Sequence, residues 1–240
     1  MKTYTLDNGI IKAVFLSFGA ILHELWVRKK DGSFINIIQG FTNLNDYISD
    51  SWSRGAIIGR YAGRLLNPIK VNEKLYEIEN EKGVMLHSGS QGWSKKNWDL
   101  VDLIGKKRIV LRYECPAGTN GFPGNVKASI SYTLNNNKLN IDYSAITTES
   151  PTHINLTNHA YFNLNNRVPI GNSYLKINAD KYLELDKNLV PTGKKLPVNM
   201  TSLDFRNSRK IGKIKLDDYF VVNQTNNPVV EFFEPKSGIN

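Results

Sequence analysis

The chain has 240 residues, 40% of them apolar, and a net charge of +9 from 31 basic and 22 acidic side chains. This size and an ordinary share of charged residues predict one globular domain, 1–240, and exclude a wholly disordered chain. The densest basic runs, Arg28-Lys29-Lys30, Lys106-Lys107-Arg108 and Lys194-Lys195, each lie beside a glycine or a predicted turn. We therefore expect solvated turns and no nucleic-acid partner.

Cysteine usage and the N-terminal sequence bear on the compartment. The single cysteine, Cys115, cannot form an internal disulfide, which favours a reducing environment. No apolar leader follows Met1, and no run approaches the roughly 18 apolar residues of a membrane helix. We expect a cytoplasmic protein with no membrane partner.

The first third of the chain predicts short strands. Residues 10–16 and 21–27 are apolar and β-branched, and an Asp31-Gly32 turn separates the second run from a third at 34–39. Asp-Gly between apolar runs is a strong hairpin signal. A short helix is expected near 44–48, capped by Asn43 or Asn45.

The middle of the chain gives the clearest strands. Residues 126–134 and 139–145 alternate apolar and polar side chains on either side of a turn at 135–137, and 109–114 reads as a further strand. A period of two in adjacent runs predicts a hairpin with one buried face, which for 139–145 carries Leu139, Ile141, Tyr143 and Ala145. Long helical periodicity is absent, and several short strands separated by Gly, Pro and Asn predict an all-β fold, a sandwich or a barrel.

Four histidines are the candidates for acid–base chemistry near neutral pH. We expect structural roles for His23, in a predicted strand, and His153. His87 ends a strand and enters a Gly/Ser loop, whereas His159 lies among amides and aromatic rings that suit a sugar. Local context alone leaves a structural role open for both. No metal motif or phosphate-binding loop is present, so we expect no metal and no cofactor.

Three motifs resemble the aldose 1-epimerase (galactose mutarotase) family. They are Ile-Ile-Gly-Arg-Tyr-Ala-Gly-Arg-Leu at 57–65, Leu-His-Ser-Gly at 86–89 with Trp93 and Trp98 downstream, and Asn-Leu-Thr-Asn-His-Ala-Tyr-Phe-Asn-Leu at 155–164. Shorter matches run in the family order from Asn8 to Gly238. The resemblance covers essentially the whole chain and implies a mostly antiparallel β-sandwich, the galactose mutarotase-like supersandwich.

The resemblance also implies a reaction and its residues. A base removes the proton of the anomeric hydroxyl while an acid protonates the ring oxygen; the C1–O5 bond breaks, C1–C2 rotates, and the ring closes on the other face. The substrate is a small aldose sugar, and the neutral aldehyde intermediate requires no cofactor. By resemblance His159 is the acid, His87 assists at the ring-side oxygens, and Arg64, Asn158 and Asp217 bind the sugar, with a register that could instead select Asp218.

Two departures from the family pattern stand out. Gly63 replaces the usual asparagine, which predicts the loss of one sugar contact. The family's base is a glutamate beyond a turn like Pro-Lys-Ser-Gly, and this chain stops within that turn, at 235–240. We therefore expect the family's C-terminal portion to be missing, the 240-residue chain to be a weak catalyst, and a version extended through those strands to be active.

Three readings stay open from the sequence. The chain could be an active mutarotase, an inactive carbohydrate-binding chain that has lost the base, or a fragment of a longer protein.

Overall fold

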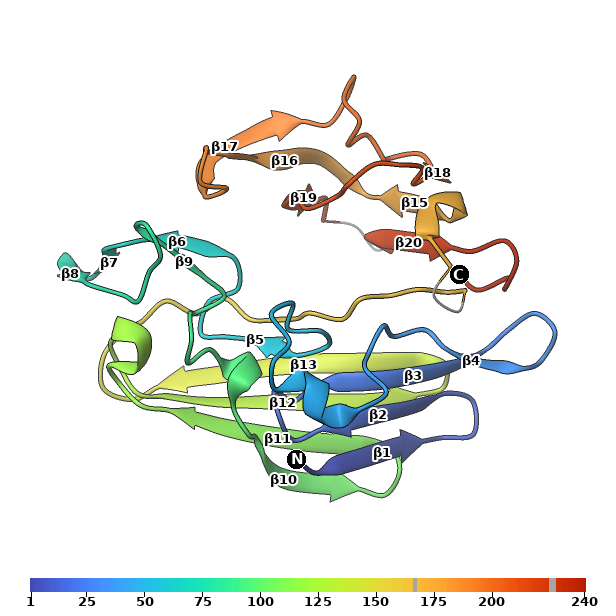
Figure 1. The fold of residues 1–240 in the computed structure, drawn as a ribbon, viewed down its shortest axis with the longest axis horizontal. Coiled ribbons are helices and arrows are strands. Elements are labelled where there is room, and N and C mark those ends of the chain that lie inside the picture. The colour runs from blue at the N-terminus through green and yellow to red at the C-terminus, as the bar shows by residue number, and fades with distance from the viewer. Residues whose placement is uncertain (166–167, 225–227) are drawn as a thin grey trace. The chain divides into compact units, whose positions relative to one another are not determined.

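A computed structural model describes residues 1–165, 168–224 and 228–240 (Figure 1). These residues form antiparallel β-sheets and four short 3₁₀ turns, with no α-helix in the described part of the chain. The all-β prediction is confirmed. The chain divides into two compact units, one of residues 1–27 and 36–162 and one of residues 28–35 and 163–240.

The first unit is built around two four-stranded sheets. Buried Phe15 and Tyr132 come from different sheets and bring their ring centroids to 4.3 Å, so apolar faces of the two sheets pack as a sandwich. The Tyr132 hydroxyl also donates to the Ala20 carbonyl at 2.7 Å. The strands of the first sheet are β1 (Thr3–Asp7), β2 (Lys12–Leu16), β3 (Leu22–Arg28) and β4 (Phe34–Asn36), of which Phe34 and Ile35 are assigned to the second unit. The strands of the second sheet are β10 (Asp99–Ile104), β11 (Arg108–Cys115), β12 (Val126–Asn135) and β13 (Lys138–Thr147).

The predicted hairpin is present as β12–β13, with Leu134 opposite Leu139 and Ile130 opposite Tyr143. The inward face of β12 is fully buried, as its alternation predicts. The expected buried face of β13 was only partly right: Leu139, Ile141 and Ala145 are half-buried, and Tyr143 is 39% exposed. A period-two pattern locates a face of a strand, but burial depends on what packs against it.

Three two-stranded ladders complete the first unit, and two of them end next to His87 and His159. The elements are β5 (Ile57–Ile58) with β14 (Thr157–Asn158), β6 (Arg64–Leu66) with β9 (Val84–Leu86), and β7 (Ile69–Val71) with β8 (Lys74–Tyr76), and the turns η1 (Leu44–Tyr47), η2 (Trp93–Lys95) and η3 (Thr119–Gly121). The predicted helix near 44–48 is the 3₁₀ turn η1, in which the Asn43 side chain accepts the Asn45 N–H. The cap was therefore Asn43.

The second unit contains two three-stranded antiparallel sheets. Their order is β18-β15-β20 and β17-β16-β19. Ile177, Ala179 and Phe205 form its buried cluster. The elements are η4 (Ile170–Asn172), β15 (Tyr174–Ile177), β16 (Ala179–Leu185), β17 (Pro191–Pro197), β18 (Arg209–Lys210), β19 (Phe220–Val222) and β20 (Val230–Phe233).

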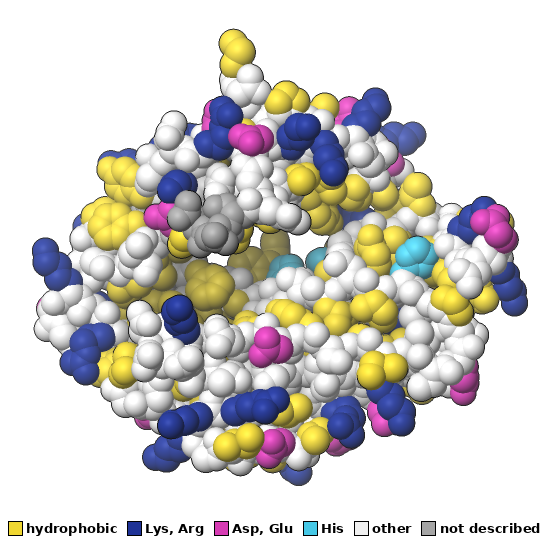
Figure 2. Space-filling model, turned by 180° about the vertical axis from the view of Figure 1, so that it is seen from behind, with side chains coloured by type: hydrophobic (Ala, Val, Ile, Leu, Met, Phe, Trp, Pro, Cys, Tyr) yellow, Lys and Arg dark blue, Asp and Glu magenta, His cyan; other side chains and the backbone are white. Residues whose placement is uncertain are grey.

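The surface charge follows the sequence expectation on the face that Figure 2 shows. Lysines and arginines are spread around that face, with acidic side chains among them, and do not gather into one patch. In the described part of the chain, no helix has the length and hydropathy to cross a membrane.

Candidate functional site

The main chain on both sides of His159 is fixed by hydrogen bonds to one neighbouring segment. Thr157 and Asn158 pair with the fully buried Ile58 and Ile57 in the β14–β5 ladder. The ladder continues past β14, because the His159 N–H donates to the Ala56 carbonyl (2.8 Å) and the His159 carbonyl accepts the Gly55 N–H (2.9 Å). His159 is therefore the first residue after strand β14, and its side chain is half-buried.

His87 follows the end of a second ladder. Strand β9 pairs with β6, placing Leu86 opposite Arg64. The next residue, His87, is bound to Gly63 twice: its N–H donates to the Gly63 carbonyl (2.9 Å), and its ring Nδ1 accepts the Gly63 N–H (3.0 Å). As predicted, this histidine ends a strand and enters the Gly/Ser loop.

The two histidines lie together. Their ring centroids are 5.2 Å apart with an interplanar angle of 75°, an edge-to-face arrangement, and the Tyr161 ring lies 5.2 Å from His159 on the same segment. One run of the chain supports both rings, because residues 57–66 contain β5, which pairs with the His159 strand, and β6, which pairs with the His87 strand. Two imidazole rings can donate or accept protons, and the neighbouring Tyr161 ring offers an aromatic face. Together such groups can bind a polyol and transfer a proton.

Arg64 and Asn158, the expected sugar-binding residues of the first unit, lie close to these histidines. Arg64 is half-buried on β6, and among the described residues no carboxylate forms a salt bridge with its guanidinium. The Asn158 amide binds main chain on both sides: Nδ2 donates to the Gly55 carbonyl (2.9 Å) and Oδ1 accepts the Ala160 N–H (3.0 Å). Asn158 thus braces the His159 segment, and its role as a sugar ligand stays a prediction.

Asp217 belongs to the second unit. It is exposed, it precedes β19, and its N–H donates to the neighbouring Asp218 carboxylate (3.3 Å). The sugar-binding role predicted for Asp217, and the alternative register on Asp218, stay predictions.

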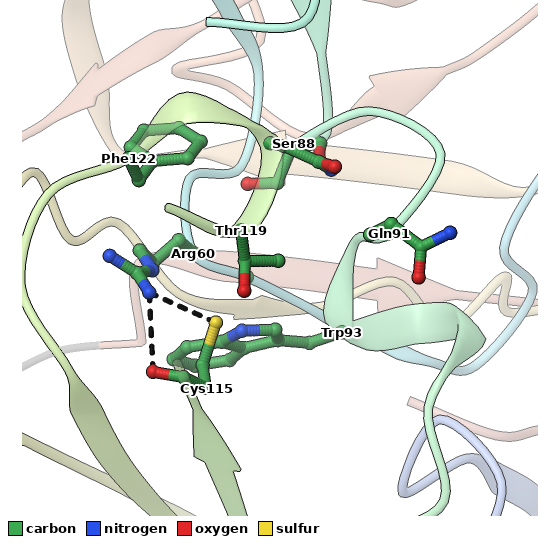
Figure 3. A pocket seen from close by; sticks show the side chains of 9 residues that line it. Arg60, Ser88, Gln91, Trp93, Cys115, Thr119 and Phe122 are labelled. Atoms are coloured by element: carbon green, nitrogen blue, oxygen red, sulfur yellow. Dashed lines mark hydrogen bonds between the residues drawn. The ribbon is translucent and has the colours of Figure 1, made fainter. Parts of the chain in front are cut away.

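A recess with about 150 Å³ of empty space, part of it open solvent, lies beside the His87 loop (Figure 3). None of the predicted site residues lines it. It surrounds Arg60, which is 1% exposed and donates from Nη1 to the Pro123 carbonyl (2.7 Å) and from Nη2 to the Cys115 sulfur (3.0 Å). The recess is a structural junction around a buried guanidinium. It is lined by Gly59, Arg60, Ser88, Gln91, Trp93, Cys115, Thr119, Asn120 and Phe122.

The other two histidines have structural partners. Burial lowers the pKa of His23, with an opposing effect from Glu24, and its Nδ1 lies 2.8 Å from the Tyr47 hydroxyl. Burial also raises the pKa of Tyr47 to about 12. His153 Nε2 donates to the Lys70 carbonyl at 3.0 Å. In the described part of the chain, no three His, Cys, Asp or Glu side chains are grouped as a metal site.

The sequence did not reveal the role of Gly63. Its absent side chain was interpreted only as a lost sugar contact, whereas both of its main-chain polar groups bind His87. Main-chain groups carry no residue-type signal, so no pattern in one sequence could have identified this pair. The sequence does show Tyr161 within the 155–164 motif, but it could not predict that the Tyr161 ring lies 5.2 Å from the His159 ring.

Comparisons with known proteins identify one family, and its match extends over nearly the whole chain. A family model described as Aldose 1-epimerase matches residues 2–240. The aldose 1-epimerase of Streptococcus thermophilus is 35% identical over 226 residues, which cover 90% of this chain and 65% of that protein. The galactose mutarotase of Homo sapiens is 31% identical over 217 residues, which cover 89% of this chain and 63% of that protein.

Solved structures show the same similarity. An aldose epimerase homologue from C. elegans superposes with a TM-score of 0.91 at 26% identity, covering 99% of this chain and 77% of that one. A galactose 1-epimerase from Lactobacillus acidophilus gives a TM-score of 0.84 at 29% identity, covering 96% of this chain and 72% of that one. The chain thus spans slightly less than two thirds of the two curated relatives, 65% and 63% of their lengths.

Proposed function

Because the chain belongs to the aldose 1-epimerase family, we propose that it acts on an aldohexose such as galactose or glucose and interconverts its α- and β-anomers. The observation that carries this proposal is the edge-to-face pair of His87 and His159, with ring centroids 5.2 Å apart. Each ring follows the end of a hydrogen-bonded ladder. Side chains on such supports hold the geometry that proton transfer requires.

The chemistry is a pair of balanced proton transfers. The anomeric hydroxyl gives up its proton as the C1–O5 bond breaks, and the ring oxygen takes a proton from His159. The open aldehyde turns about C1–C2, and the same steps in reverse close the ring on the other face. The proton acceptor at the anomeric oxygen is assigned to no residue of this chain.

Three residues are proposed to bind the sugar. Arg64 supplies a cation next to the His87 strand, with no acidic partner among the described residues, and such a guanidinium can donate to two sugar hydroxyls. As the resemblance implies, we assign sugar-binding roles to Asn158 and Asp217 and an assisting role at the ring-side oxygens to His87. The protein as a whole forms one mutarotase-like domain in this proposal, and it works in the cytoplasm without nucleic acid or membrane.

The test is polarimetry of fresh α-D-galactose and α-D-glucose. The acceleration of mutarotation by this chain over the spontaneous rate should be weak. His159→Asn should lower whatever acceleration is measured, by up to the roughly 10²–10⁴-fold that a general acid usually contributes. The control is His153→Asn, whose ring binds a main-chain carbonyl; it should leave the rate unchanged. Sugar binding without acceleration would favour the carbohydrate-binding reading, and absence of both would overturn the proposal.

A further inference from the structure

A main-chain hydrogen bond from Gly63 determines which ring nitrogen of His87 carries the proton. Its Nδ1 accepts the Gly63 N–H at 3.0 Å, and the Gly63 amide is buried. A buried N–H that loses its partner is costly, and the great majority of such groups in folded proteins are paired. The only hydrogen bond that this N–H makes among the described residues therefore requires a lone pair, not a proton, on Nδ1.

A neutral imidazole carries its single proton on one nitrogen, and the other nitrogen accepts. From the Gly63 contact we infer that His87 is fixed as the Nε2–H tautomer and serves the sugar as a hydrogen-bond donor through Nε2, with Gly63 as the positioning residue. The doubly protonated ring would set an N–H against the buried Gly63 N–H. This inference rests on the proposed function for the identity of the sugar, but the tautomer does not depend on it.

The loop that carries His87 is built to hold this form. His87 and Ser88 both have left-handed backbone angles, with φ of 51° and 65°, and Gly89 follows with φ of 71°. Side chains rarely adopt this conformation, and it persists where the surroundings enforce it. Here the Ser88 hydroxyl accepts the Tyr61 N–H (2.6 Å) and donates to the Tyr61 carbonyl (3.2 Å), while the Asn120 amide donates to the Ser88 carbonyl.

The direct experiment is ¹⁵N NMR of the 240-residue chain at pH 8, where an ordinary imidazole is neutral. The spectrum should show His87 with its proton on Nε2, and a scalar coupling across the hydrogen bond should correlate the Gly63 amide nitrogen with His87 Nδ1. A proton on Nδ1 of His87 would overturn the inference. This readout requires neither sugar nor catalysis, so its failure is distinguishable from failure of the proposed function.

Two substitutions separate the two ends of the ring. In His87→Asn the side-chain oxygen takes the place of Nδ1 and can still accept the Gly63 N–H, and asparagine tolerates the left-handed conformation. His87→Gln places an amide near the Nε2 position and leaves the Gly63 N–H without that acceptor.

Amide hydrogen exchange should report this difference. Exchange at Gly63 should stay close to the wild-type rate in His87→Asn and rise at least about fivefold in His87→Gln, as expected when one hydrogen bond to a buried amide is lost. The control is the His159 amide, which donates to the Ala56 carbonyl and should exchange alike in all three proteins. Equal Gly63 rates in the three proteins would contradict the role given to Nδ1.

Discussion

Replacing the buried guanidinium of Arg60 should destabilise the first unit more than any surface substitution. Its two terminal nitrogens donate to the main-chain carbonyls of Pro116 (2.9 Å), Pro123 (2.7 Å) and Gly124 (2.9 Å). Arg60→Met leaves these three acceptors without the donor that the buried guanidinium supplies. At about 1–3 kcal/mol for each buried acceptor, with partial relief from the apolar side chain, we expect a loss of about 3–6 kcal/mol in the free energy of unfolding.

The assay is guanidinium chloride unfolding followed by tryptophan fluorescence, because Trp93 and Trp98 are buried in the same unit. Arg60→Lys keeps the charge but replaces the planar fork with one ammonium group, so its loss should be intermediate. The control is Arg112→Met at an exposed position of β11, which should change stability by less than about 0.5 kcal/mol. A loss below about 1 kcal/mol for Arg60→Met would refute the reasoning.

Three further predictions concern packing and ionisation. In Gly59→Ala the added Cβ would clash with a ring carbon of the buried Trp93. The free energy of unfolding should therefore fall by about 1–3 kcal/mol, and an unchanged melting temperature would contradict this contact. Tyr132→Phe removes the buried donor to the Ala20 carbonyl and should cost about 1–3 kcal/mol by chemical denaturation, whereas a neutral result would mean that water replaces the donor. Burial raises the pKa of Tyr47 from 10.0 to about 12, so the folded state favours the neutral phenol: this stabilisation is present below pH 10 and is lost as the pH rises from 10 towards 12. Ultraviolet titration of wild type and Tyr47→Phe should show this late ionisation, and a Tyr47 that titrates near pH 10 would be evidence against it.

The sequence predicts the local parts of this fold well. The β12–β13 hairpin and the capped turn at 44–47 follow from alternation, turn residues and an asparagine cap, all of which act over a few residues. Strand β10 (Asp99–Ile104) was not predicted: its apolar residues come in two adjacent pairs, Leu100-Val101 and Leu103-Ile104, and show no period of two. Its partner β11 was predicted from the run Ile-Val-Leu-Arg-Tyr-Glu at 109–114, and the structure buries Ile109 and Leu111.

The site was predicted at the level of motifs but not of contacts. The 155–164 and 86–89 motifs identify His159 and His87, and the structure brings their rings together. The reason for their proximity is the pairing of β5 with β14, about one hundred residues apart in the chain, and of β6 with β9. Pairing over such separations depends on the whole set of packed surfaces, which no single run of residues encodes.

The most direct test of the account is an NMR titration of the four histidine rings with D-galactose. The account predicts that the His87 and His159 resonances shift together with one dissociation constant. His23, bound to the Tyr47 hydroxyl, and His153, bound to the Lys70 carbonyl, should stay unchanged. Shifts confined to His23 or His153, or no shift at any histidine at saturating sugar, would contradict the assignment of the sugar site to the His87–His159 pair.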